Sequence, residues 1–356
     1  MDLPTEQPVN LLIVGCRGLT ASAVAAGIVA MQKCVIPASY GVTSHAAFRA
    51  RELPGIESIR LGGWDFRNES LHSAVVAHRH LPAAVVDACR DANVPVKPGV
   101  VTALDYPPPT TADFVRRPDT LEQGVAWVVE DIKEMAAGVP DARTVVVYLG
   151  SPSRRPAEGF DKKALRGSAD TFPAAVIYAL GAIQSGCDFV DFTPSYALDY
   201  PQLRVLASRR GTQLAGRDGS TGQTMIKETV AELMYRRGMR LDSWYSTNLI
   251  GNNDGLVLTT PGFGDAKFSD KSDVLPLARR DHVVDICYMP HWADRKESWD
   301  ALECTSWLGG ELSVRINWRG SDSELAAPLV IDLVRLLVSN PRRPGFRPEL
   351  GFFFKR

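Results

Sequence analysis

The sequence predicts an α/β fold in which a helix-covered parallel sheet is interrupted by an inserted α+β domain. Two features of the 356-residue chain lead to this fold class. Its first half alternates short apolar runs with helical segments, which is typical of a parallel sheet covered by helices. From about residue 211 to 318 the pattern changes, and runs such as 283–288 and 312–318 alternate apolar with polar side chains. Such runs indicate a mixed or antiparallel sheet with one open face.

The chain opens with a strand, a glycine turn and a helix. Residues 10–14 are an apolar run, residues 15–22 form the turn, and an Ala/Val-rich helix is expected to about Met31. This order is typical of the first unit of a dinucleotide-binding fold, although Ala21 stands at the third glycine position. A strand–helix turn without a ligand has the same pattern. A bound dinucleotide would contact Gly15, Cys16, Arg17, Gly18, Leu19 and Thr20.

Further elements extend the predicted parallel sheet. Residues 144–149 and 189–192 are apolar strands, with a helix expected at 172–183 between them. Residues 326–338 predict a strongly apolar helix, with which the chain returns to the first domain. We therefore expect one domain from residues 1–210 and 319–356, and an inserted domain from residues 211–318.

The composition excludes several classes of function. Lys and Arg number 40 against 41 Asp and Glu, for a net charge of −1, whereas nucleic-acid and anionic-membrane binders normally carry a basic surplus. No apolar stretch reaches the ~18–20 residues of a membrane span, and the N-terminus is acidic and polar where a signal peptide would be basic. Six scattered cysteines without a C-x-x-C pair are typical of a reducing compartment, and the isolated histidines give no metal signature. We expect a cytoplasmic protein.

Residues 213–255 carry most of the functional information. The turn Gly219-Ser220-Thr221-Gly222-Gln223-Thr224 precedes an amphipathic helix, and the unpaired N–H groups at a helix start hold phosphate well. An ordinary capped helix is the alternative. Farther on, Asn252-Asn253-Asp254 lies between two glycines. Such a polar cluster is either a surface turn or a site that hydrogen-bonds a polyhydroxylated ligand.

Five ordered motifs resemble one family. The runs GRDGSTGQT at 216–224 and STNLIGNNDG at 246–255 are similar to the G-D-D-x-K-S-G-Q-T and S-Y-N-H-L-G-N-N-D-G segments of the myo-inositol-1-phosphate synthase family. The runs DAKFSDK at 265–271, HWADRK at 291–296 and SDSELAAP at 321–328 resemble its paired-lysine, G-D-S-K and E-D-S-x-L-A-A-P segments. The likeness is strong over about residues 170–335 and continues more weakly to the N-terminus.

The resemblance implies a reaction and an assembly. Family members oxidise C5 of an open-chain hexose 6-phosphate with tightly held NAD⁺, form an enolate at C6, close the ring by attack on C1 and reduce the ketone again. It also implies a Rossmann-type NAD-binding domain, an inserted domain for catalysis and oligomerisation, a sugar phosphate substrate and a homotetramer.

The catalytic residues are expected to be lysines with acidic partners. Lys267 and Lys271 lie four residues apart, so on a helix they would share one face and lower each other's pKa; spacing alone favours a solvated charged face. The resemblance assigns both to the site. It adds Lys296 beside Asp294, with Asp322 as the orienting carboxylate, and Lys355 in the final FFFK run.

The remaining roles also follow from the resemblance. Substrate would be bound by Ser220, Thr221, Gly222, Gln223, Thr224, Asn248 and Asn252. Cofactor would be bound by the 15–20 turn together with Asp65, Asp218, Asn253 and Asp254. Asp65 ends a Gly62-Gly63-Trp64-Asp65 run similar to the family's G-W-D loop and would hold the adenosine ribose; a capping role after a tight turn is the alternative.

Two departures from the family pattern keep alternatives open. Arg217 replaces the first acidic residue of G-D-D, and Ser220 replaces the lysine before S-G-Q-T. These changes leave open a homologue that cyclises fructose 6-phosphate to a five-membered cyclitol phosphate for natural-product biosynthesis. A net NAD-dependent dehydrogenase and a non-catalytic NAD-binding scaffold are further alternatives.

Overall fold

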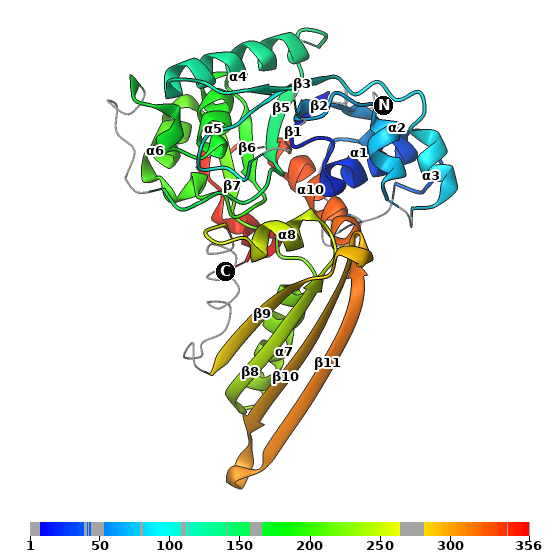
Figure 1. Ribbon diagram of the computed structural model, residues 1–356, viewed down its shortest axis with the longest axis vertical. Helices are drawn as coiled ribbons and strands as arrows, with labels where there is room; N and C mark the ends of the chain where they lie inside the picture. The colour runs from blue at the N-terminus through cyan, green and yellow to red at the C-terminus, as the bar shows by residue number, and fades with distance from the viewer. Residues whose placement is uncertain are drawn as a thin grey trace.

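The computed structural model describes residues 8–38, 41, 43, 53–78, 81–107, 112, 114–139, 141–156, 166–263, 281–339 and 341–355. It consists of a layered α/β part and a long, narrow sheet that extends away from it (Figure 1). The two parts are joined near helix α8 (Asn253–Thr259).

An eight-stranded parallel sheet forms the centre of the first part, in the order β12-β7-β6-β5-β1-β2-β3-β4. Its strands are β1 (Val9–Val14), β2 (Ile59–Asp65), β3 (Val96–Val100), β4 (Val115–Arg116), β5 (Arg143–Tyr148), β6 (Asp188–Asp191), β7 (Gln213–Gly216) and β12 (Gly345–Phe346). All six residues of β1 are buried because helices cover both faces of the sheet. The α/β fold class is therefore confirmed.

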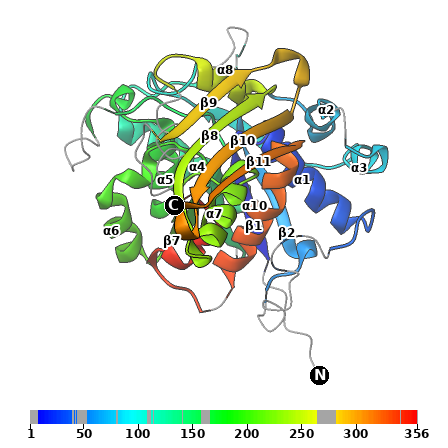
Figure 2. The ribbon, with the colours of Figure 1, turned by 90° about the horizontal axis from the view of Figure 1, so that it is seen from below.

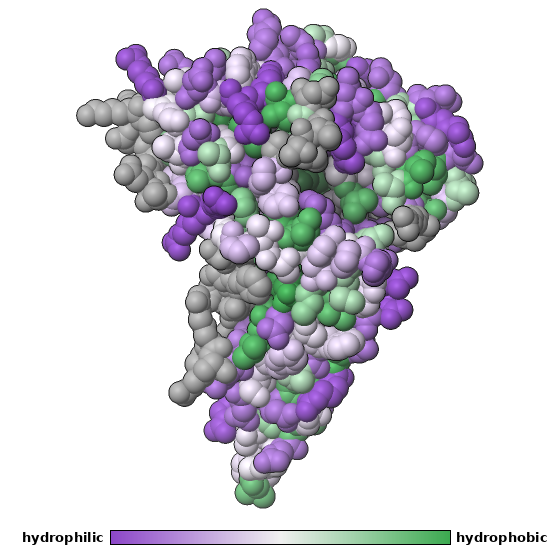
Figure 3. Space-filling model, viewed as in Figure 1, coloured by the Kyte–Doolittle hydropathy of each residue, from purple (hydrophilic) through white to green (hydrophobic). Residues whose placement is uncertain are grey.

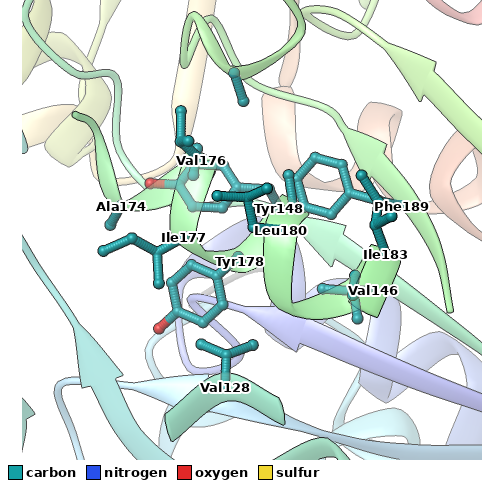
Figure 4. Close-up of a cluster of buried hydrophobic side chains, with 14 of the residues drawn as sticks. Val128, Val146, Tyr148, Ala174, Val176, Ile177, Tyr178, Leu180, Ile183 and Phe189 are labelled. Carbon is teal, nitrogen blue, oxygen red and sulfur yellow. The ribbon is translucent and has the colours of Figure 1, made fainter. Parts of the chain in front are cut away.

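The two faces of this sheet carry separate helix layers. Leu11 and Ile13 of β1 pack with α1 (Leu19–Gln32) and α10 (Asp322–Val338), whereas Leu12 and Val14 face α4 (Leu121–Ala136) and α5 (Ala174–Gln184). Figure 4 shows the second cluster, with Tyr178 of α5 among Val128, Ile177 and neighbouring side chains. The other helices of the first part are α2 (Leu71–Val76), α3 (Ala83–Ala88) and α6 (Pro201–Arg210). Short 3-10 turns span Ile56–Ser58, Ala169–Thr171, Ala197–Asp199 and Pro348–Phe353.

The second part is a four-stranded mixed sheet in the order β11-β10-β8-β9. Its strands are β8 (Arg240–Ile250), β9 (His282–Tyr288), β10 (Arg295–Thr305) and β11 (Glu311–Ser321), of which only β8 and β9 pair in parallel. Short 3-10 turns span Pro290–Trp292 and Trp307–Gly309. Helix α7 (Gln223–Arg236) covers one face, where Met234 packs on Trp244 and Leu302 (Figure 2). The other face carries exposed side chains and has no covering helix among the described residues.

The sheets to which β7 and β11 belong indicate where the inserted domain begins and ends. Strand β7 (Gln213–Gly216) pairs with β6 and so belongs to the large sheet, although it follows the expected boundary at residue 210. Strand β11 runs to Ser321, past the expected boundary at 318, and leads directly into α10. We therefore place the limits of the inserted domain near Gly216 and Ser321. None of the described helices is long and apolar enough to cross a membrane.

Candidate active site

Two adjoining cavities lie at the carboxyl ends of the parallel strands, where the two parts of the molecule meet. The larger has a volume of about 620 Å³ and the smaller about 180 Å³. They share the wall residues Gly18, Leu19, Leu149, Gly150, Ser151 and Asn253, and so form one continuous cleft. Hydrophilic and hydrophobic residues are mixed on the surface where the wide and the narrow parts of the molecule meet (Figure 3). Ligands of open α/β sheets bind at this end of the strands.

The turn after β1 forms the floor of the larger cavity. Gly15 and Cys16 donate their N–H groups to the carbonyl of Trp64, at 2.8 and 3.0 Å, which seats the turn over the end of β2. Gly15 has a φ of +79°, and a Cβ there would lie 3.1 Å from the carbonyl oxygen of Leu149. Gly18 is the N-cap of helix α1, so the start of this helix has no side-chain cap, and Gly18, Leu19 and Thr20 border the cleft.

Only part of the predicted 15–20 turn faces the cleft. Gly15, Gly18, Leu19 and Thr20 contribute to its walls, whereas the side chains of Cys16 and Arg17 are buried beneath it. The Arg17 guanidinium donates to the carbonyls of Glu69 and Val94, both at 2.7 Å. Burial raises the pKa of the Cys16 thiol to about 12. These two side chains therefore support the turn instead of binding a ligand.

Asp65 is the last residue of β2, directly beside the turn. Its carboxylate accepts the N–H of Arg17 at 2.7 Å and that of Arg67 at 3.0 Å, and it lines the larger cavity. In the sequence, only the Gly62-Gly63-Trp64-Asp65 run points to Asp65 as a cofactor ligand. The structure adds that Asp65 ends the strand next to β1, the position at which dinucleotide-binding folds hold the ribose.

The turn before α7 borders the smaller cavity. Asp218, Gly219, Thr221, Gln223 and Thr224 contribute to its walls. The predicted residues Ser220 and Gly222 lie behind the cavity wall. Ser220 donates its N–H to the carbonyl of Phe353 at 2.9 Å, and a Cβ on Gly222 would lie 2.5 Å from the Trp318 ring.

Gln223, the first residue of α7, has its side chain committed to the small sheet. Its amide nitrogen donates to the Ser298 hydroxyl. It also donates to the two carboxylate oxygens of Asp300, both at 3.2 Å. Asp300 also accepts the indole N–H of Trp244 at 2.8 Å. The side chain of Gln223 therefore anchors the helix start beside the smaller cavity, which this residue also lines.

Lys296 and Asp322 form an ion pair in the wall of the smaller cavity. The Lys296 ammonium lies 2.9 and 2.8 Å from the two carboxylate oxygens, and the residue is only 3% exposed. Thr221 donates its hydroxyl to the same carboxylate at 3.1 Å. The structure thus brings together residues from β10, from the start of α10 and from the turn before α7.

Two further predicted residues, Asp294 and Asn248, also lie outside both cavity walls. The Asp294 carboxylate accepts hydrogen bonds from Asn252 at 2.9 Å, from Ser323 at 3.0 Å and from Ser321. It joins the start of α8 to the start of α10 and acts through Asn252, which does line the smaller cavity with Asn253 and Asp254. Asn248 is fully buried in β8. Neither Asp294 nor Asn248 lines a cavity, so the catalytic role of Asp294 and the substrate contact of Asn248 stay predictions.

Lys355 returns from the C-terminal segment to the turn before α7. Its ammonium is paired with the Asp218 carboxylate, and both side chains are nearly buried. Its N–H donates to the Asp218 carbonyl at 2.9 Å. Lys355 and Asp218 both line the smaller cavity. Lys267 and Lys271 lie outside the described residues, so their positions stay predictions.

Much of the cleft wall comes from residues that no sequence motif marks. The segments 149–152 after β5 and 192–194 after β6 line the smaller cavity, and Tyr148, Tyr178 and Asp105 line the larger one. Burial raises the pKa of Asp105 to about 6 and that of Tyr148 well above its usual value. The signal that could have located the two segments is their position directly after parallel strands.

Arg217 and Ser220, the two residues that differ from the family pattern, contact other parts of the protein. Arg217 is paired with Asp199 and lies 6.0 Å over the Tyr196 ring, outside both cavity walls. Ser220, as noted, lies behind the wall. Within the part of the chain that the structure describes, no three His, Cys, Asp or Glu side chains come together to hold a metal ion.

Comparison with known proteins gives a consistent result. Residues 222–323 match the model of the myo-inositol-1-phosphate synthase family. The inositol-3-phosphate synthase 1 of Bacteroides thetaiotaomicron is 25% identical over 386 aligned residues, covering 99% of this chain and 90% of that protein. The crystal structure of a myo-inositol-1-phosphate synthase-related protein from Thermotoga maritima is 25% identical, with a TM-score of 0.74 over 98% of this chain and 92% of the other. An inositol-3-phosphate synthase from Caenorhabditis elegans shares the fold, with a TM-score of 0.85 at 22% identity over 99% and 81% of the two chains. The chain is thus similar to inositol-phosphate synthases along almost its whole length, and its residues 222–323 match the myo-inositol-1-phosphate synthase family model.

Proposed function

We propose that this protein converts a hexose 6-phosphate into a cyclitol phosphate, using NAD catalytically, in the manner of glucose 6-phosphate to myo-inositol 1-phosphate. One observation carries the proposal: a single cleft joins a groove suited to a dinucleotide with a pocket that holds a buried lysine and a helix start. The relative from Bacteroides thetaiotaomicron is named as an inositol-3-phosphate synthase.

The larger cavity has the features that NAD requires. The uncapped start of α1 suits the pyrophosphate, and the Asp65 carboxylate at the end of β2 suits a ribose hydroxyl. Gly99 and Val100 of β3 line the same cavity as Asp65, and an adenine ring would lie on this side of it. When bound, NAD⁺ would accept a hydride from C5 of the sugar and return it after the ring has closed.

The smaller cavity suits the sugar phosphate. Thr221, Gln223 and Thr224, at the start of α7, line it, and so does Lys355, whose ammonium is paired with Asp218. The positive end of the helix favours a phosphate at this place. Asn252 and Asp254, which also line this cavity, have the donors and acceptors that sugar hydroxyls need.

Lys296 is suited to the charge that develops during enolisation. Its ammonium is held in one direction by the two oxygens of Asp322, so it need not reorganise when an oxyanion forms beside it. Lys267 and Lys271 remain the proposed partners in proton transfer.

We further propose a homotetramer assembled through the open face of the small sheet. Trp299, Tyr245 and Val283 are 48%, 44% and 43% exposed on that face. Exposed large apolar side chains on an uncovered sheet mark interaction surfaces. A monomer mass from light scattering at micromolar concentration would contradict this assembly.

Product identification tests the proposed reaction. The protein is incubated with trace NAD⁺ and either glucose 6-phosphate or fructose 6-phosphate, and the product is identified by NMR. A six-membered cyclitol phosphate from glucose 6-phosphate supports the proposal. A five-membered ring from fructose 6-phosphate would support the natural-product alternative, and stoichiometric NADH without a cyclic product would indicate a dehydrogenase.

A further inference from the structure

The rim of the larger cavity carries an arginine that the proposed function leaves without a role. Arg67 lies two residues after Asp65, lines the cavity, and has a side chain that is 49% exposed. In dinucleotide-binding folds an acidic residue at the end of the second strand accepts the ribose 2′-hydroxyl, and a nearby arginine accommodates a 2′-phosphate instead. The rim of this protein therefore contains both kinds of residue.

The structure also shows how the arginine is occupied. Its Nη1 atom lies 3.1 Å from Oε1 of Glu69, and its Nε atom lies 3.5 Å from Oδ1 of Asp65. Its Nη2 atom donates to the carbonyl of Arg17. Each of the three guanidinium nitrogens thus has a partner within the protein. A 2′-phosphate would have to displace the Glu69 carboxylate, which would also repel it.

We propose that Glu69 is a specificity-determining residue, which by holding Arg67 makes the cleft select a dinucleotide with a free 2′-hydroxyl over its 2′-phosphorylated counterpart. This inference rests on the proposed NAD site. It assigns different roles to the two carboxylates. Asp65 is the direct partner of the ribose hydroxyl, whereas Glu69 acts through Arg67.

The roles predict distinct effects of two substitutions. Glu69→Gln keeps an oxygen that can accept from Arg67 but removes the negative charge, so Arg67 becomes available to a phosphate dianion. Arg67→Gln removes the only guanidinium among the described residues that line this cavity. Because the site is partly exposed and screened by salt, we expect a change of about tenfold in affinity from the one charge.

The test measures binding, independent of turnover. Dissociation constants for NAD⁺ and NADP⁺ are determined by isothermal titration calorimetry on the wild-type protein, Glu69→Gln, Arg67→Gln and the double variant. Glu130→Gln is the matched control, because Glu130 lies 3.6 Å from Lys133 on α4 and lines neither cavity. ADP-ribose and 2′-phospho-ADP-ribose repeat the comparison without the nicotinamide.

The expected result is that wild type and Glu130→Gln prefer NAD⁺, and that Glu69→Gln binds NADP⁺ about tenfold more tightly while its affinity for NAD⁺ changes less than about twofold. The gain should disappear in the double variant. An unchanged NADP⁺ affinity in Glu69→Gln, or a gain that persists without Arg67, would overturn the inference alone. Failure of the wild-type protein to bind either nucleotide would overturn it together with the proposed NAD site.

Discussion

Lys296 of β10 and Asp322 of α10 are joined by two contacts of 2.9 and 2.8 Å at the junction of the inserted sheet with the parallel-sheet domain. The strand that carries Lys296 belongs to one part of the molecule, and the helix that begins at Asp322 packs on α1 in the other. The pair is therefore positioned by both parts, and its direction depends on how they are joined.

Loss of the Lys296 charge should abolish most turnover. Lys296→Met keeps the length of the side chain but removes the ammonium, and loss of a group that stabilises developing charge costs roughly 10²–10³ in rate. NAD binding should be largely retained, since Lys296 lines only the smaller cavity. Steady-state kinetics and calorimetry measure the two effects, with the exposed Lys133→Met as the control. More than about a tenth of wild-type activity in Lys296→Met would show that the residue is not catalytic.

The pair of Lys355 and Asp218 should hold the C-terminal segment on the site. Both side chains are about 5–6% exposed, and removing one partner of a buried ion pair destabilises by about 3–5 kcal/mol. We expect Lys355→Met to show this loss in urea unfolding, and Lys355→Met/Asp218→Asn to recover part of it because no buried charge is left unpaired. A single variant as stable as wild type would mean that the segment is held by other contacts.

Asp300 should control sugar-phosphate affinity through Gln223. Asp300→Ala leaves the Trp244 indole without its acceptor and Gln223 with Ser298 alone, which we expect to cost about 2–3 kcal/mol and to loosen the start of α7. KM for the sugar phosphate should rise more than kcat falls. Asp300→Asn retains an acceptor oxygen and should restore much of both. If Asp300→Ala lost stability with KM unchanged, the residue would have no part in positioning the helix start.

A buried lysine of α7, Lys227, should make the stability of the protein depend on pH in the alkaline range. Lys227 is 2% exposed, donates to Ser246 at 2.6 Å and lies 2.9 Å from Nε2 of His282. Burial lowers its pKa from 10.5 to about 8. Between about pH 8 and 10.5 the unfolded chain then binds more protons at this residue than the folded one, so its contribution to stability rises with pH across that window.

Comparison with Lys227→Met isolates this contribution. The free energy of unfolding of wild type minus that of the variant should be constant below pH 8 and increase from pH 8 to 10.5. Subtraction removes the effects of tyrosines, which titrate in the same range in both proteins. A flat difference over this window would show that Lys227 has an ordinary pKa in the folded state.

The parallel-sheet domain could be predicted closely because its strands are continuous apolar runs. The expected strands at 144–149 and 189–192 correspond to β5 (Arg143–Tyr148) and β6 (Asp188–Asp191), and the expected helix at 172–183 to α5 (Ala174–Gln184). The inserted sheet was harder to delimit. Strands β8 and β10 turn polar residues such as Ser246 and Asp300 inward, which hides the apolar alternation that marks a strand.

The direction of individual side chains was the least predictable feature of the site. Asp294 is two residues before Lys296, but its carboxylate takes three donors in the interior while Lys296 faces the cavity. Arg17 likewise lies in the predicted turn and points beneath it. Motif spacing brings a residue to the site, whereas packing and hydrogen bonding decide which way its side chain points.

The fate of the hydrogen on C5 of the sugar tests the proposed cyclisation most directly. Hexose 6-phosphate deuterated at C5 is incubated in excess with the protein and trace NAD⁺, while absorbance at 340 nm is followed and the product is analysed by NMR and mass spectrometry. We predict cyclic product over many turnovers, flat absorbance, and deuterium retained on the corresponding ring carbon. Loss of the deuterium to solvent or to free NADH would contradict the carbocyclisation and indicate a net dehydrogenase.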